Sequence, residues 1–209
     1  MTVTHTPTFH VVTTGRLSSE DLCSILQRIH PYVDAIHIRE KEKTAIELYR
    51  LIESLQQSAV PLDKLIVNDR VDVAVLSKIW GVQLAYHSLE VEVVKQEFLN
   101  LHVGKSVHSL QEGLEAEKQG ADFLLYGHIY HTNSKQNLQP RGIYGLETIA
   151  RSVRVPVIAL GGIQPHHVQE VMKAGAHGIA VMSGVFQSPN PFERVKQYQS
   201  ELLKWSEKR

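Results

Sequence analysis

Short apolar runs recur along the whole chain and are separated by longer amphipathic segments. Runs rich in valine, isoleucine and leucine are typical of strands that are buried on both faces. The predicted strands lie at residues 9–13, 34–38, 65–68, 81–84, 102–107, 123–129, 155–160 and 179–182. Each is followed by polar or glycine-containing sequence, which is expected to end the strand.

Between the strands, apolar residues return at helical spacing, which predicts amphipathic helices. The predicted stripes are Leu22, Ile25, Leu26 and Ile29; Ile46, Tyr49, Ile52 and Leu55; and Phe192, Val195, Leu202 and Trp205. Ser18 and Ser19 precede two acidic residues, a pattern that predicts a helix N-cap. Pro165 follows a glycine turn and is expected at the first position of a helix.

Strands that alternate with helices predict right-handed βαβ units and a parallel sheet. Eight repeats favour closure into a (β/α)8 TIM barrel, an α/β fold, with residues 1–209 as a single domain. A doubly wound open sheet is the alternative. Its glycine-rich turn after the first strand is missing, since the chain reads Thr13-Thr14-Gly15-Arg16 there.

Composition narrows the class of protein. Lysine plus arginine and aspartate plus glutamate are 22 each, and this zero net charge gives no support for nucleic-acid binding. Cys23 is the only cysteine, so no disulfide can form within the chain. We see no signal peptide and no apolar stretch of membrane-spanning length, and we expect a cytoplasmic protein without a membrane partner.

Two neighbouring strands are predicted to end in small residues. The run 155–160 leads into Gly161-Gly162-Ile163, and the run 179–182 ends at Met182 before Ser183-Gly184. Glycine lets a ligand approach the backbone closely, and loops after strands seven and eight of a barrel often bind phosphate. The two turns together predict a phosphate site, whereas Gly161-Gly162 alone is more typical of a tight strand-to-helix turn.

Polar side chains gather where the other predicted strands end. They are His37, Arg39, Glu40 and Lys41; Asn68 and Asp69; Lys105, Ser106 and His108; and His128, His131, Thr132 and Lys135. In a closed barrel these residues share one rim, where Arg39, Lys41 and Lys135 would converge on a phosphate or carboxylate. The alternative for residues 39–41 is a solvated charge run that caps a helix.

His128 ends an otherwise apolar strand beside a polar loop. A histidine there can be a hydrogen-bonded structural residue or a proton carrier, because its ordinary pKa of roughly 6.5 lies near neutrality. His128 and His131 lack a third ligand at metal-binding spacing, and Asp69 is a single carboxylate, so we predict no metal site and no cofactor.

The residues 38–41, 68–69, 104–108, 127–135, 161–163 and 182–184, taken in order, resemble thiamin phosphate synthase and its relatives. That resemblance covers nearly the whole chain and implies a (β/α)8 barrel. The synthase has proline at the positions of His128 and His131 and glutamine at that of His37. It also carries a second Mg²⁺-binding aspartate after strand four, where this chain reads Ala85-Tyr86-His87-Ser88.

These departures resemble the TenI branch, the thiazole tautomerases, whose catalytic histidine occupies the position of His128. The resemblance implies an isomerase that aromatises a carboxythiazole phosphate tautomer by a proton shift at His128. It also implies that the backbone around Gly162, Met182, Ser183 and Gly184 holds the substrate phosphate. Arg39 and Lys135 would pair with a carboxylate, and Asn68 and Ser106 match pocket residues of the synthase.

Two other functions remain open at this point. One is a working synthase, a transferase that would need Mg²⁺ at Asp69. The other is a non-catalytic regulatory protein that binds a thiamin intermediate. In each case the expected partner is a small thiazole phosphate, and we expect the chain to form a homo-oligomer.

Overall fold

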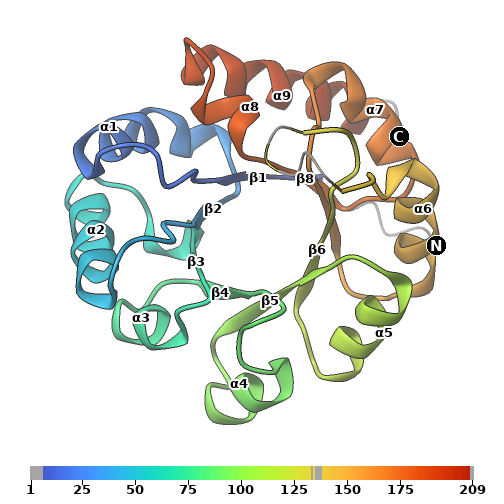
Figure 1. Ribbon diagram of the computed structural model, residues 1–209. Helices are drawn as coiled ribbons and strands as arrows, with labels where there is room; N and C mark the ends of the chain where they lie inside the picture. The colour runs from blue at the N-terminus through green and yellow to red at the C-terminus, as the bar shows by residue number, and fades with distance from the viewer. Residues whose placement is uncertain (1–6, 133, 135–137, 208–209) are drawn as a thin grey trace.

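The computed structural model describes residues 7–132, 134 and 138–207, and in it eight parallel strands close into a barrel (Figure 1). The strands are β1 (Thr8–Val12), β2 (Ala35–Ile38), β3 (Leu65–Asn68), β4 (Gly81–Leu84), β5 (His102–Val107), β6 (Phe123–Gly127), β7 (Val157–Leu160) and β8 (Gly178–Val181). Consecutive strands are neighbours, and β1 pairs with β8 to close the barrel. The predicted (β/α)8 fold is confirmed.

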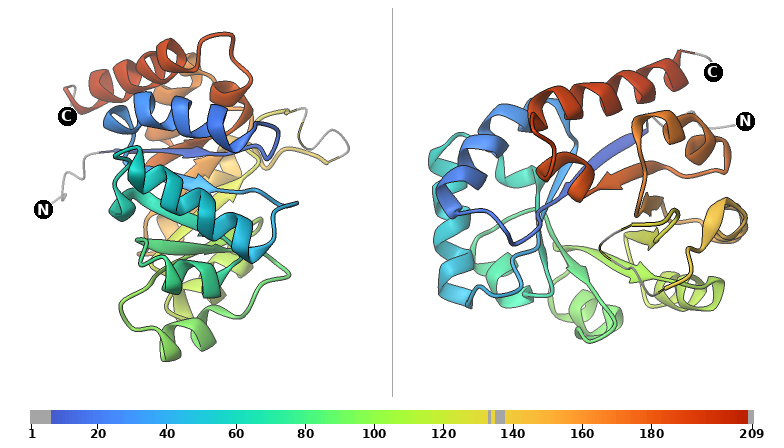
Figure 2. Two further views of the ribbon diagram at one scale, coloured as in Figure 1. Left: turned by 90° about the vertical axis from the view of Figure 1, so that its left-hand side faces the viewer. Right: turned by 45° about the horizontal axis from the view of Figure 1, so that its top comes forward.

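Helices form a ring outside the barrel (Figures 1 and 2). The α-helices are α1 (Ser19–Ile29), α2 (Ala45–Gln57), α3 (Val71–Leu76), α4 (Val91–Glu97), α5 (Leu110–Lys118), α6 (Gly142–Ser152), α7 (Val168–Lys173), α8 (Ser183–Phe186) and α9 (Pro191–Ser206). Short 3-10 helices are η1 (His30–Tyr32), η2 (Leu62–Lys64) and η4 (Pro165–His167). The assignment of the full range 1–209 to one domain stays a prediction.

The barrel wall separates two apolar layers, because alternate residues of a strand point to opposite sides. Val11 and Ile36 belong to the large cluster packed against the helices, whereas Val12 and Ala35 belong to a smaller interior cluster. The interior cluster is completed by Ile66, Phe123, Leu125, Ile158 and Ala180. Apolar residues are required on both faces, which explains why the strands lack alternation in the sequence.

The helix predictions are confirmed in part. The Ser18 hydroxyl accepts a hydrogen bond of 3.0 Å from the Asp21 backbone N–H, as expected of an N-cap. On α2 the buried face is instead Leu48, Leu51, Ile52 and Leu55, and Ile46 is 53% exposed. Pro165 opens the 3-10 helix η4, and the α-helix begins later, at Val168.

The end of β6 is shorter than predicted, since the strand stops at Gly127. The following segment nevertheless stays beside β7. The backbone N–H groups of Ile129 and Tyr130 donate to the carbonyls of Leu160 and Gly161, each at 3.0 Å. The loop after β6 therefore leaves the barrel alongside the glycine turn that follows β7.

Because all strands are parallel, their carboxyl ends meet at one mouth of the barrel. Every strand-end residue predicted from the sequence and described by the structure lies in or just after these ends. Among the described residues, no helix is both long and apolar enough to cross a membrane.

Candidate functional site

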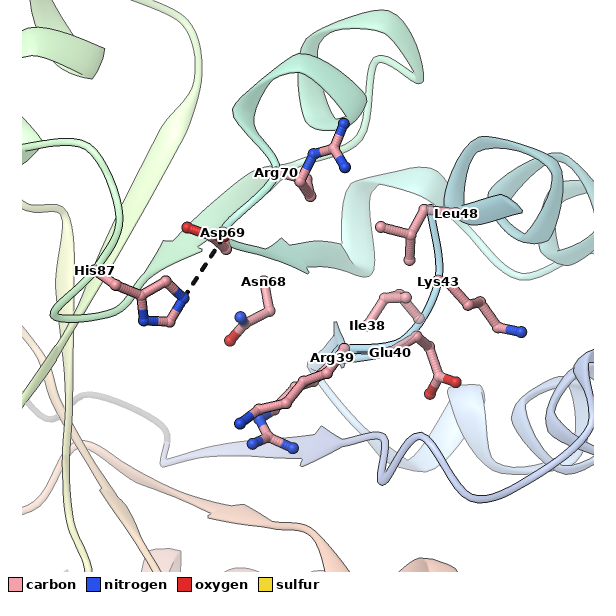
Figure 3. Close-up of a pocket in the computed structure, with 10 residues that line it drawn as sticks. Ile38, Arg39, Glu40, Lys43, Leu48, Asn68, Asp69, Arg70 and His87 are labelled. Atoms are coloured by element: carbon pink, nitrogen blue, oxygen red, sulfur yellow. Dashed lines mark ion pairs between the residues drawn. The ribbon is translucent and has the colours of Figure 1, made fainter. Parts of the chain in front are cut away.

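A cavity of about 370 Å³ opens at the ends of β2 and β3 and reaches the loop after β4 (Figure 3). It is lined by Ile38, Arg39, Glu40, Lys41, Lys43, Leu48, Asn68, Asp69, Arg70 and His87. Cationic or protonatable side chains outnumber the two carboxylates in this lining. The cavity is therefore suited to an anionic ligand.

Arg39 leaves the end of β2 half-buried, with its guanidinium turned toward the Asn68 side chain (Figure 3). The backbone N–H of Arg39 donates a 2.8 Å hydrogen bond to the Thr13 hydroxyl. Burial lowers the pKa of Arg39, and the nearby Glu40 carboxylate opposes that effect. The Arg39 side chain therefore lines the cavity from a backbone that the hydrogen bond to Thr13 holds in place.

Glu40 is buried, only 6% exposed, and its carboxylate connects the loop after β2 to the loop after β1. Its Oε1 atom accepts hydrogen bonds from the Thr13 hydroxyl at 2.6 Å and from the Gly15 backbone N–H at 3.2 Å. Loss of these partners would leave the buried carboxylate unpaired, which costs free energy because desolvation penalises an unpaired charge. Glu40 is therefore not part of a solvated charge run, whereas Lys41 is exposed.

Asp69 follows β3 in a left-handed conformation, with φ of 70°. Its backbone N–H donates to the Gln83 carbonyl at 2.9 Å, and its Oδ2 atom lies 3.7 Å from Nε2 of His87. Asn68, one residue earlier, lines the same cavity. This loop gives the site one carboxylate, and the His87 imidazole lies within ion-pair distance of it.

The family resemblance implies Mg²⁺ at Asp69, where the protein itself supplies only a small part of that ion's oxygen ligands. Mg²⁺ prefers six hard oxygen ligands in an octahedron. Asp69 faces the nitrogen of His87, and the other cavity carboxylate, Glu40, is occupied by Thr13 and Gly15. Among the described residues, no cluster of three or more histidine, cysteine, aspartate or glutamate side chains could hold a metal.

Ser106 lies on β5, where its hydroxyl accepts a 3.0 Å hydrogen bond from the Gln83 side-chain amide. Gln83 is only 2% exposed, so this pair belongs to the barrel interior. Lys105, the preceding residue, turns its ammonium group to the Ala85 carbonyl at 3.0 Å. The Ser106 hydroxyl therefore faces the inside of the barrel.

His128 lies directly after β6 and is 4% exposed. Its Nε2 atom is 3.2 Å from the Leu138 carbonyl, in the loop before α6. The ring-bearing Cβ also packs over Gly161, where an added methyl group would come within 2.3 Å of it. His128 lies outside the cavity lining and is in contact with the β6–α6 loop.

The glycine turns after β7 and β8 are connected through a tyrosine. Gly161 and Gly162 have φ of 104° and 68°, which only glycine adopts readily. The Tyr198 hydroxyl donates to the Ile163 carbonyl at 2.8 Å, and a Cβ on Gly184 would lie 2.7 Å from that hydroxyl. The two turns predicted to bind phosphate thus lie side by side.

Six of the predicted site residues fall into two groups on one rim. Arg39 and Asn68 line the basic cavity, while Gly162, Met182, Ser183 and Gly184 form the paired glycine turns. Lys135 lies outside the described residues. Sequence reasoning missed Lys43, Arg70 and His87 as cavity residues, although Arg70 directly follows the predicted Asn68-Asp69 pair.

The barrel interior also holds two histidines: His37, which the sequence predicted at the rim, and His10, which it did not single out. His10 and His37 are 6% and 1% exposed, and Nδ1 of His10 lies 3.0 Å from Nε2 of His37. Burial lowers the pKa of His10 to about 4. Burial, and then the neighbouring His10, hold the pKa of His37 well below its usual range. The pair is neutral at physiological pH.

Fold and site together define a (β/α)8-barrel protein with a cationic cavity and a pair of glycine turns at the carboxyl ends of its strands. Residues 9–185 match the family model described as thiamine monophosphate synthase. The chain belongs to this family.

Similar proteins agree with that assignment. The thiamine-phosphate synthase of Pyrococcus furiosus is 39% identical over 93% of this chain and 92% of its own. A solved thiamine phosphate pyrophosphorylase structure from the same organism has a TM-score of 0.84 at 33% identity, covering 96% of this chain and 98% of that one. A 3-hexulose-6-phosphate synthase structure, 16% identical with a TM-score of 0.75, covers 93% of this chain and 99% of that one and shares the fold.

The prediction of an isomerase is wrong, because the relatives are named synthases, which are transferases. The assignment to the TenI branch also finds no support among these names. Both predictions depended on the departures from the synthase at positions 37, 128 and 131 and after the fourth strand, and the catalytic role was assigned to His128. The structure places that side chain outside the cavity and against the carbonyl of Leu138.

Proposed function

We propose that the protein is a thiamine-phosphate synthase, a transferase that joins a pyrimidine diphosphate to a thiazole phosphate. The observation that carries this proposal is 39% identity to a protein of that name over 93% of the chain. In the reaction, the thiazole ring nitrogen forms a bond to the methylene carbon of the pyrimidine. The bond from that carbon to the diphosphate oxygen breaks, and diphosphate leaves.

The basic cavity is the proposed site of the diphosphate. Arg39 and Lys43 bring positive charge to one opening of the barrel, and His87 lies beside Asp69 at its edge. Arg70 also lines the cavity, but its guanidinium is paired with the Asp72 carboxylate. Guanidinium groups bind phosphate oxygens through paired hydrogen bonds, and partial burial strengthens these bonds. The same cations stabilise the negative charge that develops as diphosphate leaves.

The paired glycine turns are the proposed site of the thiazole phosphate. The phosphate would lie against the backbone of Gly162 after β7 and of Met182, Ser183 and Gly184 after β8, where α8 begins. Barrels often bind phosphate at these two loops. Asn68 and Ser106, at the ends of β3 and β5, would then face the rings between the two anionic groups. From its position in the sequence, we propose Lys135 as a further cation that pairs with an anionic group of the substrate.

This transfer does not require His128 to carry a proton, because no ring proton moves when the carbon–nitrogen bond forms. We propose instead that His128 supports the loop after β6 through its contact with the Leu138 carbonyl. Its position over Gly161 also places it behind the glycine turn. A cytoplasmic location and a homo-oligomeric state remain predictions.

The test is a transferase assay with purified protein, a pyrimidine diphosphate and a thiazole phosphate, with and without added Mg²⁺. We expect thiamine phosphate and diphosphate to form in equal amounts, measured by chromatography and by a coupled diphosphate assay. Tyr144→Phe, an exposed position on α6, serves as the control variant. Absence of product under both conditions would contradict the proposal.

A second candidate is a ligand-binding member of the family that does not catalyse transfer. The observation that favours it is the Asp69–His87 pair, together with serine rather than an acid at position 88. A site with a single available carboxylate is poorly equipped for a metal-activated diphosphate. This candidate predicts that calorimetry detects binding of thiazole phosphate while the assay above yields no product.

A further inference from the structure

Tyr130, in the segment after β6, reaches across to the helix that follows β7. Its hydroxyl donates a 2.7 Å hydrogen bond to Oε2 of Glu170 on α7. Burial, followed by this bond to Glu170, raises the pKa of Tyr130, so the phenol remains a donor at physiological pH. A hydrogen bond from a hydroxyl to a carboxylate is stronger than one between neutral groups.

The Tyr130 ring has a second partner in the same region. It stacks on the imidazole of His167, with ring centroids 3.9 Å apart and planes 18° from parallel. His167 is itself held, since its Nδ1 accepts from the Gln164 backbone N–H at 3.1 Å and its ring packs against His166 at 4.1 Å. Tyr130 is thus anchored to η4 and α7 by both its ring and its hydroxyl.

This anchor lies directly behind one of the glycine turns. The Tyr130 backbone N–H donates to the Gly161 carbonyl at 3.0 Å. A Cβ built on Gly162 would meet the carbonyl oxygens of His131 and Tyr130 at 2.5 and 2.6 Å. The backbone of residues 130–131 therefore fills the space behind Gly162 and limits where the N–H groups of this turn can point.

We propose that Tyr130 is a positioning residue, which through Glu170 and His167 holds the segment after β6 against Gly162 and so shapes the phosphate site. The inference rests on the proposed function, because it takes the turn at Gly162 as the place where the thiazole phosphate binds. Tyr130 itself contacts no substrate. It connects the segment after β6, which includes His128, to the Gly161-Gly162 turn, where the phosphate would bind.

Tyr130→Phe keeps the stacked ring and removes only the hydroxyl, so the variant is expected to fold. We expect the Kd for thiazole phosphate and for inorganic phosphate to rise roughly 5-fold, the effect of one lost hydrogen bond. The kcat stays unchanged while KM for thiazole phosphate rises. Amide exchange at residues 161–163 becomes faster, because the turn loses its support.

Two further variants separate positioning from general stability. Glu170→Gln keeps an acceptor for the phenol and is expected to retain most of the wild-type affinity. Combining Tyr130→Phe with Glu170→Ala should weaken binding no more than Tyr130→Phe alone, since both remove the same bond. Tyr144→Phe, which removes an exposed hydroxyl, is the matched control and should change nothing.

The inference is overturned if Tyr130→Phe binds both phosphates as the wild type does, or if it lowers Tm without changing Kd. Additive effects in the double variant would also overturn it. If wild-type protein binds neither ligand, the proposed function fails on its own. The exchange rates at residues 161–163 then decide the positioning role, which an unchanged rate in Tyr130→Phe would refute.

Discussion

The hydroxyl of Tyr198 donates a hydrogen bond of 2.8 Å to the carbonyl of Ile163, which joins the last helix to the turn after β7. Tyr198 is fully buried, and burial raises its pKa to about 12. The same hydroxyl fills the space beside Gly184. One side chain thus holds both glycine turns in place from the outside of the barrel.

Tyr198→Phe should therefore destabilise the protein by about 1–3 kcal/mol, because the Ile163 carbonyl would lose its partner in a buried position. The free energy of unfolding can be measured by urea denaturation. Tyr32→Phe, a partly buried tyrosine near α9, is a matched control. Equal stability of Tyr198→Phe and wild type would show that the bond contributes nothing.

Gly162→Ala should weaken binding of the thiazole phosphate roughly 10-fold, a change of about 1.4 kcal/mol. The added methyl group would meet the carbonyls of His131 and Tyr130 and force the turn to move. Gly142→Ala is the control: its φ of 71° is similar, but no atom lies within 4 Å of the added carbon. Titration calorimetry compares the two. Equal losses would mean that backbone strain, and not the contact, is responsible.

Arg39→Gln should raise the Kd for a pyrimidine diphosphate roughly 10- to 100-fold, since a hydrogen bond to a charged group contributes about 1.5–3 kcal/mol. Binding of thiazole phosphate at the other end of the mouth should change little. Arg151→Gln, which alters an exposed arginine on α6, is the charge-matched control. A loss of affinity for both ligands would show that the two anion sites are not separate.

Stability should fall as the pH is lowered from about 6.5 toward 4. In the unfolded chain His10 takes up a proton near its ordinary pKa of 6.5, whereas in the folded protein burial delays this to about 4. The unfolded state therefore binds more protons in this window, so the stabilisation is full above pH 6.5 and is lost as pH falls. The shift corresponds to about 3 kcal/mol.

The variant His10→Gln tests that account, because an amide can still bond to His37 but does not titrate. Its unfolding free energy, measured by urea denaturation from pH 7 to pH 4, should depend less steeply on pH than that of the wild type. His166→Gln, at an exposed position, should behave as wild type. Parallel pH profiles for all three proteins would exclude His10 as the cause.

His128→Ala should raise KM for the thiazole phosphate and lower Tm, while kcat changes less than 3-fold. Removing the ring deletes the contact with Leu138 and leaves space behind Gly161. A residue that assists the chemical step by acid–base catalysis would behave differently, with kcat falling by about 10² to 10⁴. Steady-state kinetics with both substrates distinguish the two roles. A large loss of kcat at unchanged KM would contradict the supporting role of His128.

The strands were predictable because a barrel wall is apolar on both faces, which leaves continuous runs in the sequence. Helix faces were less predictable. On α2 the buried side includes Leu48 and Leu51 rather than Ile46, because several apolar residues compete and packing against the neighbours selects among them. The turn after β7 was visible as a glycine pair, since the positive φ angles of Gly161 and Gly162 favour this residue.

The contacts that shape the site were not predictable. Tyr198 and Ile163 are 35 residues apart, and Tyr130 and Glu170 are 40 apart. No local pattern marks either pair. His87 and Arg70 carried a weak signal, since each lies just after a predicted strand, but only the closed mouth shows that they border the same cavity as Arg39.

By itself, the sequence determined the order of strands and helices, the end of the barrel that carries the polar residues, and the two glycine turns, because these follow from local periodicity and backbone preference. The tertiary structure decided which side chains meet. It turned His128 toward Leu138, placed His87 beside Asp69 and buried His10 against His37. Such pairings depend on how neighbouring strands and loops are brought together in space, which residue spacing along one chain does not encode.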